Sequence, residues 1–306
     1  MNEITTVWPD FASDFSCKAN RCQHSCCRGW EIDVDGATAE WYQLLDGKIG
    51  EELRENIVQA EDGTYSFRLT KDERCPFLRK DGLCRLILEL GEDALCEICT
   101  MHPRFFVMCG DVELAGFGLA CEKTVELLLA DKKPLTFYRE GAEQKKITFA
   151  GLVKQLGLSG ECEEDRQEKS FSFQLEFEFN EEKIRQLLLL MQETEPIDEA
   201  WTEHLHYLLR EKELVKKCCQ KYAEIYDDAA FDRITEYIAY RQLGQAEIYG
   251  LHAIYRYAEM NAMYIFLESA VTGNLQEAVR RWSEQIEYSE ENTELLLQAA
   301  KSTSFI

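Results

Sequence analysis

The spacing of apolar and polar residues predicts that the second half of the chain is helical. After Asn180, apolar residues recur at Ile184, Leu187, Leu188 and Met191, which is typical of an amphipathic helix, and Asn180 can cap its start. Further helical windows follow at about 198–226, 229–243, 246–270, 274–287 and 290–301. We therefore expect a helical bundle at the C-terminal end.

The first 180 residues have a more mixed pattern. Alternation of apolar and polar residues predicts short strands at 31–35 and 64–69, and an edge or hairpin strand at 171–179. Helical spacing predicts helices at 37–59, near 83–90 and at 115–130, with the first broken at Gly47 and Gly50. The expected fold is therefore mainly α with a small β component.

Lys132-Lys133-Pro134 is the first sequence that indicates a domain boundary. We expect a cysteine-rich metal-binding domain at 1–134, a connecting segment with a β-strand or hairpin at 135–180, and a helical bundle at 181–306. No Gly- or Ser-rich linker separates the cysteine-rich part from the bundle, so we expect the two to pack together.

Composition and charge narrow the class of protein. The chain has 306 residues, and 45% of them are hydrophobic, which favours a folded chain over a disordered one. A net charge of −23 opposes nucleic-acid binding; it can attract a lysine-rich protein or simply keep the surface solvated. The first residues do not resemble a signal peptide, and no apolar run is long enough to span a membrane. We therefore expect a cytoplasmic protein that binds neither nucleic acid nor membrane.

Cysteines are concentrated between residues 17 and 121. In a reducing cytoplasm, such a cluster indicates metal binding or catalysis rather than disulfides. Thiolates select zinc or an iron–sulfur cluster, and either takes four ligands. The adjacent Cys26 and Cys27 point to opposite sides of an extended chain, which favours two sites, or one site with a thiol in reserve. Ten of the thirteen cysteines lie here, at 17, 22, 26, 27, 75, 84, 96, 99, 109 and 121.

Two common motifs are absent from the sequence. The iron–sulfur motif of radical S-adenosylmethionine enzymes is C-x3-C-x2-C. Cys22 and Cys26 have the first spacing, but the third position of the motif is Gly29 rather than cysteine. A nucleotide-binding fingerprint needs closely spaced glycines after a strand, and none is found. Neither class of fold is therefore indicated.

The cysteine motifs resemble a known family. The chain has Cys17-x4-Cys22-x3-Cys26-Cys27-x-Gly29-Trp30, then Cys75-Pro-Phe-Leu with Gly82-Leu-Cys84, then Cys99 followed by His102-Pro103-Arg104. This pattern resembles the YkgJ-type iron- or zinc-chelating cysteine cluster. Residues 113–121 and the late sequence Trp282-Ser-Glu-Gln-Ile-Glu-Tyr-Ser-Glu-Glu-Asn292 resemble the flagellin lysine-N-methylase branch of that group. The likeness covers about 15–130 and, with less specific motifs, about 230–298.

The resemblance implies a protein-lysine N-methyltransferase that carries an iron–sulfur cluster. Such an enzyme would transfer methyl groups from S-adenosylmethionine to lysines of flagellin or a similar surface protein. The implied centre is a 4Fe-4S cluster, with zinc as the alternative. Cys96, Cys109, Cys162 and the pair Cys218-Cys219 fall outside the implied ligand set. That set is Cys17, Cys22, Cys26, Cys27, Cys75, Cys84, Cys99 and Cys121.

Methyl transfer to lysine needs a neutral amine, so a site must desolvate the amine or accept its proton. Trp30 can face the sulfonium of the donor or cover the metal, and Arg104 can bind the donor carboxylate or pair with an acid. The sequence singles out no catalytic residue. Several carboxylates and tyrosines could accept the proton or contact the substrate lysine, but the tyrosines could equally be core residues and the late glutamates a solvated helix face. These residues are Glu113, Glu122, Tyr237, Tyr240, Tyr255, Tyr257, Glu284, Glu287, Glu290 and Glu291.

A second hypothesis from a different class remains open. The same cysteines would suit a non-catalytic iron- or zinc-binding module for metal storage, sensing or electron transfer. The two hypotheses differ in one property, because only a methyltransferase needs affinity for S-adenosylmethionine.

Overall fold

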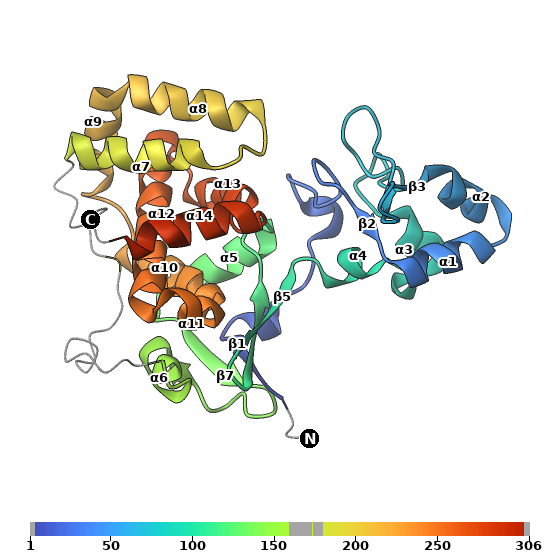
Figure 1. Ribbon diagram of the computed structural model, residues 1–306, viewed down its shortest axis with the longest axis horizontal. Helices are drawn as coiled ribbons and strands as arrows, with labels where there is room; N and C mark the ends of the chain where they lie inside the picture. Colours follow the sequence, from blue (N-terminus) through green and yellow to red (C-terminus); the bar gives the residue numbers. More distant parts are fainter. Residues whose placement is uncertain (1–3, 159–172, 174–179, 303–306) are drawn as a thin grey trace. The chain divides into compact units, whose positions relative to one another are not determined.

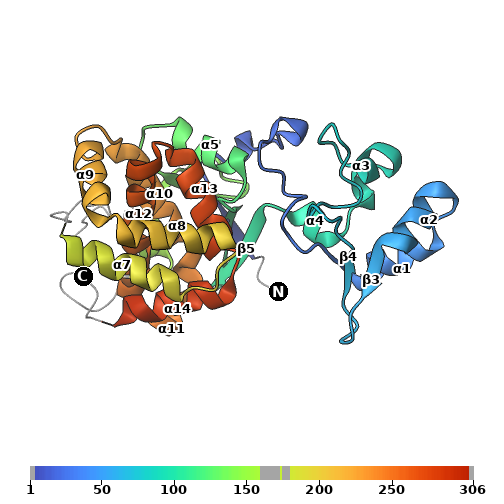
Figure 2. The same cartoon turned by 90° about the horizontal axis from the view of Figure 1, so that it is seen from above.

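The computed structural model describes residues 4–158, 173 and 180–302. The chain forms two compact units. The helical unit consists of Met1–Phe15 together with Phe105–Ile306, and the cysteine unit is Ser16–Arg104. Figures 1 and 2 show the elements of each unit.

A five-stranded sheet forms one side of the helical unit. Strand β1 pairs in parallel with β6 and antiparallel with β7, so strands distant in the sequence become neighbours. The order across the sheet is β5 (Arg104–Cys109), β6 (Val112–Phe117), β1 (Thr5–Pro9), β7 (Thr136–Arg139) and β8 (Ile147–Thr148). A 3-10 turn, η1 (Ala12–Asp14), follows β1.

Helices make up the rest of the helical unit, and the long helix α12 is buried along most of its length. Side-chain caps define several helix starts: Asn180 accepts from the amide of Glu182, and Asp198 accepts from that of Trp201. The helices are α5 (Glu122–Ala130), α6 (Phe149–Gln155), α7 (Glu181–Glu193), α8 (Glu199–Arg210), α9 (Lys212–Tyr222), α10 (Asp228–Gln242), η5 (Leu243–Gln245), α11 (Ala246–Tyr249), α12 (Leu251–Thr272), α13 (Leu275–Ile286) and α14 (Glu290–Lys301).

Helix α10 is tied to the sheet by buried polar side chains. The Tyr240 hydroxyl lies 2.8 Å from the carbonyls of both Val7 and Ala115, which joins the helix to β1 and β6. Arg233 is 1% exposed, and it donates to the carbonyl of Leu128 and to the carboxylate of Asp10. These contacts satisfy buried backbone carbonyls of the sheet and of helix α5.

The cysteine unit has a smaller core and shorter elements. The Asp35 side chain caps α1 by accepting from the amide of Thr38. The helices are η2 (Ala19–Arg21), α1 (Gly36–Leu44), α2 (Gly47–Asn56), α3 (Arg85–Leu90), η3 (Glu92–Ala94) and α4 (Glu97–Met101). A three-stranded sheet has the order β2 (Asp33–Val34), β4 (Tyr65–Phe67) and β3 (Ile57–Gln59).

The structure confirms a mainly α fold with a small β component. The amphipathic pattern after Asn180 gives α7, and Ile184, Leu187, Leu188 and Met191 are all buried as predicted. The predicted helical windows after 198 correspond to α8 through α14. The short strands predicted at 31–35 and 64–69 appear as β2 and β4.

Some sequence predictions were wrong. The predicted helix at 115–130 begins only at Glu122, because residues 112–117 form β6 and pair with β1. Gly50 does not break a helix: it lies inside α2, where a Cβ would come within 2.0 Å of the Leu45 carbonyl oxygen. Gly47, with a φ of +77°, does mark the junction between α1 and α2.

Two further predictions, the strand at 171–179 and the domain limits, are not tested by the described residues. The strand predicted at 171–179 lies outside the described residues, except for Phe173, which is buried. The domain limits 1–134, 135–180 and 181–306 stay a prediction; the compact units instead divide at residues 15 and 104, because β6 joins β1 in one sheet. Among the helices of the described residues, none has the length and apolar character required to cross a membrane.

Candidate metal centre

Backbone pairing brings Cys27 beside Cys75. The amide of Cys75 donates to the carbonyl of Cys27 over 2.9 Å, and the amide of Gly29 donates to the carbonyl of Glu73 over 2.8 Å. Arg28 and Arg74 form an antiparallel bridge between these bonds. Two segments almost fifty residues apart are thereby fixed side by side, each with a cysteine.

A tight turn then connects Cys75 to Cys84. The amide of Leu78 donates to the carbonyl of Cys75 over 3.1 Å, and Leu78 forms a bridge with Cys84. Gly82 has a φ of +81° and packs against Asn20, where a Cβ would come within 3.2 Å, so the turn favours glycine. The turn therefore explains why Cys-Pro-Phe-Leu is followed nine residues later by Gly-Leu-Cys.

Cys96 and Cys99 lie at the start of helix α4. Cys96 is at the N-cap position and Cys99 is three residues later, so the two side chains share the first turn of the helix. Asp35 fixes this turn, because its carboxylate accepts from the amide of Glu97 over 2.9 Å. The hydroxyl of Tyr42 also donates to the carbonyl of Ala94. The first contact anchors α4 to the start of α1, and the second anchors η3, just before α4, to α1.

The thiols form hydrogen-bonded pairs. A hydrogen bond with the Cys26 thiol lowers the pKa of Cys27 to about 7. Likewise, a hydrogen bond with the Cys99 thiol lowers the pKa of Cys96, and the same bond raises the pKa of Cys99. In each pair one sulfur has the character of a thiolate and the other holds the proton.

Thiols from different segments of the cysteine unit also change one another's pKa through their charges. Burial, together with the charges of Cys27 and Cys84, raises the pKa of Cys75 to about 12. Burial likewise raises the pKa of Cys84, with added contributions from the charges of Cys27 and Cys96. The pKa of Cys99 is raised by its bond to Cys96, then by burial, and then by electrostatic repulsion from Cys96, Cys27 and Cys75. We call these five residues the thiol cluster: Cys27, Cys75, Cys84, Cys96 and Cys99.

Backbone amides point at several of these sulfurs. The amides of Phe77 and Leu78 bond to the sulfur of Cys75, and their effect is to lower its pKa. The amides of Leu86 and Ile87 do the same for Cys84, which precedes helix α3. Amides at a helix start stabilise a thiolate, which is the form of cysteine that binds metal.

The thiol cluster fits a soft metal centre in the chemistry of its donors. Thiolates from separate segments, supported by backbone amides, suit zinc or an iron–sulfur cluster. In the described residues, no three or more His, Cys, Asp or Glu side chains already surround a common point in ligand geometry. The thiols face one another as hydrogen-bonded pairs instead, and ligation would require their side chains to rotate between staggered conformations.

The other predicted ligands lie in different surroundings. Cys17 is exposed, and its sulfur accepts from the amide of Ala19 over 3.3 Å. Cys22 is half-buried at the end of η2, and Cys26 is exposed beside Cys27. Cys121 belongs to the helical unit, at the N-cap position of α5. Of the eight predicted ligands, four therefore belong to the thiol cluster.

Cys96 belongs to the thiol cluster, although it falls outside the ligand set that the family resemblance implies. It is only 1% exposed, and it packs with Cys75 in the core of the cysteine unit. The signal that identifies it is the spacing Cys96-x2-Cys99, which is a common metal-ligand spacing. Cys109 and Cys219 are buried in the core of the helical unit, and Cys162 lies outside the described residues.

Trp30 and Arg104, the predicted donor-binding residues, are both in the cysteine unit. Trp30 is half-buried, three residues before β2. Arg104 is exposed, and its guanidinium donates to the carbonyl of Thr100, next to Cys99. Each residue thus lies within five positions of a cluster cysteine along the chain.

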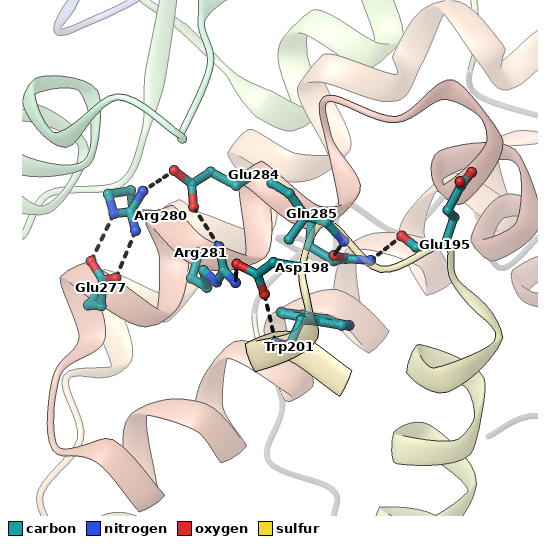
Figure 3. Close-up of polar contacts among 9 residues, drawn as sticks. Glu195, Asp198, Trp201, Glu277, Arg280, Arg281, Glu284 and Gln285 are labelled. Atoms are coloured by element: carbon teal, nitrogen blue, oxygen red, sulfur yellow. Dashed lines mark hydrogen bonds and ion pairs between the residues drawn. The ribbon is translucent and has the colours of Figure 1, made fainter. Parts of the chain in front are cut away.

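The late sequence 282–292 forms a buried hydrogen-bonding centre in the helical unit. The indole of Trp282 donates to Asn261 over 2.8 Å. Gln285 donates to the carbonyl of Glu195 and accepts from the amide of Ile197, so it holds the α7–α8 connection against α13. Figure 3 shows Gln285 directed at Glu195. These residues have structural roles.

The acidic residues of this sequence separate into two groups. Glu287 is buried and forms an ion pair with Arg241. Glu284 pairs with Arg280 and Arg281, and Arg281 also pairs with Asp198, the N-cap residue of α8, as Figure 3 shows. The expectation of a solvated face is wrong for these two because both carboxylates have arginine partners. Glu290 and Glu291, at the start of α14, are exposed.

Comparisons with known proteins add independent information. No family model matches the chain, and no solved structure matches it. The flagellar biosynthetic protein FliU of Salmonella muenchen is 31% identical over 160 residues, which cover 51% of this chain and 92% of FliU. The lysine-N-methylases of Salmonella choleraesuis and Salmonella typhimurium are each 28% identical over 157 residues.

The extent of these matches differs between the relatives. The match to each lysine-N-methylase covers half of this chain but only 39% of the methylase. FliU, in contrast, is covered over nearly its full length at an identity above 30%. On the strength of that match, the chain belongs to the flagellin lysine-N-methylase family.

Proposed function

We propose that this protein is a lysine N-methyltransferase that holds an iron–sulfur cluster and methylates flagellin or a similar surface protein. The proposed reaction and substrate are supported by the names of the relatives, which include lysine-N-methylases and a flagellar biosynthetic protein. The observation that carries the cofactor is the thiol cluster, in which sulfurs from three segments of the cysteine unit interact.

The proposed ligands are the four predicted cysteines that the fold gathers: Cys27, Cys75, Cys84 and Cys99. Four thiolates are what either a 4Fe-4S cluster or a closed zinc site requires. The exposed Cys26 would then donate a hydrogen bond to the ligand sulfur of Cys27, as second partners do in many metal sites. Cys96, which accepts the hydrogen bond from Cys99, would be a further thiolate beside the four. The bound centre would supply a covalent junction between three segments of the unit.

The methyl donor in this proposal is S-adenosylmethionine. The lysine nitrogen forms a bond to the methyl carbon while the bond from that carbon to the sulfonium sulfur breaks, which leaves S-adenosylhomocysteine and a proton from the amine. The protein must desolvate the amine or accept that proton. Trp30 is proposed to face the sulfonium, and Arg104 to bind the donor carboxylate. Trp30 closely follows Cys27 along the chain, and Arg104 closely follows Cys99.

A non-catalytic metal-binding module is the second candidate. The short match to the lysine-N-methylases favours it, because 61% of the length of those proteins has no counterpart in the aligned part of this chain. In that case the thiol cluster would store, sense or pass electrons through its metal, and S-adenosylmethionine would not bind.

One experiment separates these functions. Anaerobically purified protein is incubated with S-adenosylmethionine and purified flagellin, and intact mass spectrometry counts the methyl groups on flagellin lysines. The proposal predicts added methyl groups, a large loss of them in Cys99→Ser, and wild-type levels in Cys218→Ser. Calorimetric titration with S-adenosylmethionine provides the second measurement. No methylation together with no donor binding would contradict the proposed enzyme and favour the metal module.

A further inference from the structure

One face of the five-stranded sheet in the helical unit is lined with aromatic side chains. Trp8 on β1 is directly opposite Tyr138 on β7, so the two side chains project to the same face. Their neighbours Val7 and Phe137 project to the other face, where the Phe137 ring stacks on Tyr240 of α10 at 4.5 Å. The aromatic face is therefore the one turned away from α10.

Trp8 lies at the centre of this face. Its ring meets that of Phe106 at 87°, with centroids 5.7 Å apart, and meets that of Phe117 at 5.9 Å. Phe106 is 41% exposed, and Met108, two residues further along β5, is 48% exposed. We use the name aromatic face for Trp8, Phe106, Met108, Phe117 and Tyr138. Two perpendicular rings with an open side form two walls of a potential cage.

Carboxylates surround the same rings. Glu140 accepts a hydrogen bond from the indole nitrogen of Trp8 at 3.5 Å. Glu113 accepts from Thr6, which projects to the same side of β1 as Trp8. Burial raises the pKa of Tyr138, and the charges of Glu143, Glu140 and Asp14 raise it further. Negative charge is therefore concentrated beside the π-faces, which is the combination that attracts an ammonium group.

An ammonium group of the chain itself already occupies part of this surface. The Nζ atom of Lys146 lies over the ring of Tyr138, 4.5 Å from its centroid. That distance is within the range of a cation–π contact. The Trp8–Phe106 corner lies beside this contact and has the same kind of ring and the same nearby carboxylate, Glu140.

We propose that the aromatic face binds the ammonium or methylated ammonium of a lysine side chain from the substrate protein, seated against Trp8 and Phe106. The ring faces attract the cation, and Glu140 compensates its charge. Methylation makes an ammonium larger and less hydrated, so the rings retain it well. That the occupant is a substrate lysine rests on the proposed function; the attraction of an ammonium group rests on the rings and carboxylates alone.

The test is a titration of the protein with a short peptide that contains one trimethyllysine. Binding is measured from the shift of the indole N–H signal of Trp8 in nitrogen-15 spectra. Trp8→Phe identifies that signal by its loss. The matched probe is the same peptide with an uncharged tert-butyl analogue, which has the shape of trimethyllysine without its charge. The inference predicts a saturable shift with the charged peptide and a much weaker one with the neutral analogue. Equal shifts, or none with either peptide, would overturn it.

Variants localise the contact. Phe106→Leu keeps an apolar side chain but loses the ring, so it is expected to weaken binding about 2- to 5-fold, and Glu140→Gln by a similar factor. Phe106→Trp is expected to preserve binding. Ile248→Ala, which shortens a 65% exposed residue elsewhere in the helical unit, is the control and should bind as the wild type does. Wild-type affinity in both Phe106→Leu and Glu140→Gln would overturn the inference.

Flagellin methylation separates this inference from the proposed function. If the wild type methylates flagellin and Phe106→Leu and Glu140→Gln do so with an unchanged KM, the aromatic face is not the substrate contact, while the proposed function stands. If the wild type binds the charged peptide at Trp8 but methylates nothing, the ammonium site stands and the proposed function falls.

Discussion

The two units of the chain have cores of different size and composition. The helical unit has a large continuous core with buried aromatic residues such as Trp282, Tyr237 and Phe231. The cysteine unit has a core of ten buried residues, and two of these are Cys75 and Cys96. A small core supplies little stability, and small domains commonly add a metal or another cross-link. We therefore expect metal bound at the thiol cluster to supply stability that the helical unit obtains from its larger apolar core.

Metal removal should have the largest effect, and only on the cysteine unit. Structural thiolate centres contribute about 10 kcal/mol to the folding of small domains. A strong chelator, or Cys75→Ala, is therefore expected to unfold Ser16–Arg104 and leave the helical unit folded. Hydrogen exchange with mass spectrometry measures the two units separately. Cys218→Ser, in the helical unit, is the matched control; equal protection of the cysteine unit before and after chelation would contradict the comparison.

The next largest effect should fall on the helical unit alone. Arg233 is buried and bonds to Asp10 and to the carbonyls of Leu128 and Lys133. Arg233→Met leaves these acceptors without a donor, so we expect a loss of about 3–5 kcal/mol in the free energy of unfolding. Urea denaturation measures it. Arg210→Met, which removes an exposed ion pair with Glu211, should change stability by less than about 1 kcal/mol.

Glycine substitutions provide a smaller and more local comparison. A Cβ at Gly116 on β6 would come within 2.6 Å of the Phe105 ring and 2.7 Å of the Tyr237 hydroxyl. Gly116→Ala should therefore destabilise the helical unit by about 1–3 kcal/mol through overpacking. At Gly36, in the first turn of α1, a Cβ meets nothing within 4 Å. Gly36→Ala should be neutral or slightly stabilising, and thermal denaturation of both variants tests the difference.

A pH-dependent contact should have the smallest effect. His204 on α8 bonds to both oxygens of Glu268 on α12 at 2.9–3.0 Å, and this hydrogen bond raises the pKa of His204 above its usual 6.5. The added stability is therefore fully present below about pH 6.5 and is lost as the pH rises through the higher folded value.

Because His204 is 34% exposed, His204→Gln should cost less than about 1 kcal/mol at pH 5.5. The cost should shrink at about pH 8.5, where the wild-type imidazole has lost its proton. Urea denaturation of both proteins at the two pH values gives the difference. A cost that grows as the pH rises would contradict this assignment.

The helices were predictable from sequence because their signals are local. Asn180 caps α7, and the i, i+3, i+4, i+7 spacing of its apolar residues lies on one face. In contrast, β1 and β6 are more than a hundred residues apart in the sequence, and no local sequence pattern predicts that they pair. The apolar sequence of β6 runs directly into α5, so periodicity alone merged the strand into the helix.

The sequence predicted part of the thiol cluster, and its metal stays a prediction. The cysteine motifs identified Cys27, Cys75, Cys84 and Cys99, which the fold gathers in one unit. They did not assign Cys96, although its spacing from Cys99 was visible. The backbone amides that point at Cys75 and Cys84 arise from a turn and a helix start, so only the folded chain reveals them.

The central claim is that thiols from separate segments of the cysteine unit hold one soft metal centre. The most direct test is iron, zinc and acid-labile sulfide analysis of anaerobically purified protein, with an absorption spectrum, for the wild type, Cys27→Ser and Cys218→Ser. The account predicts about four irons and four sulfides per chain, or else one tightly bound zinc, lost in Cys27→Ser and retained in Cys218→Ser. Wild-type protein without stoichiometric metal, or metal content unchanged in Cys27→Ser, would contradict it.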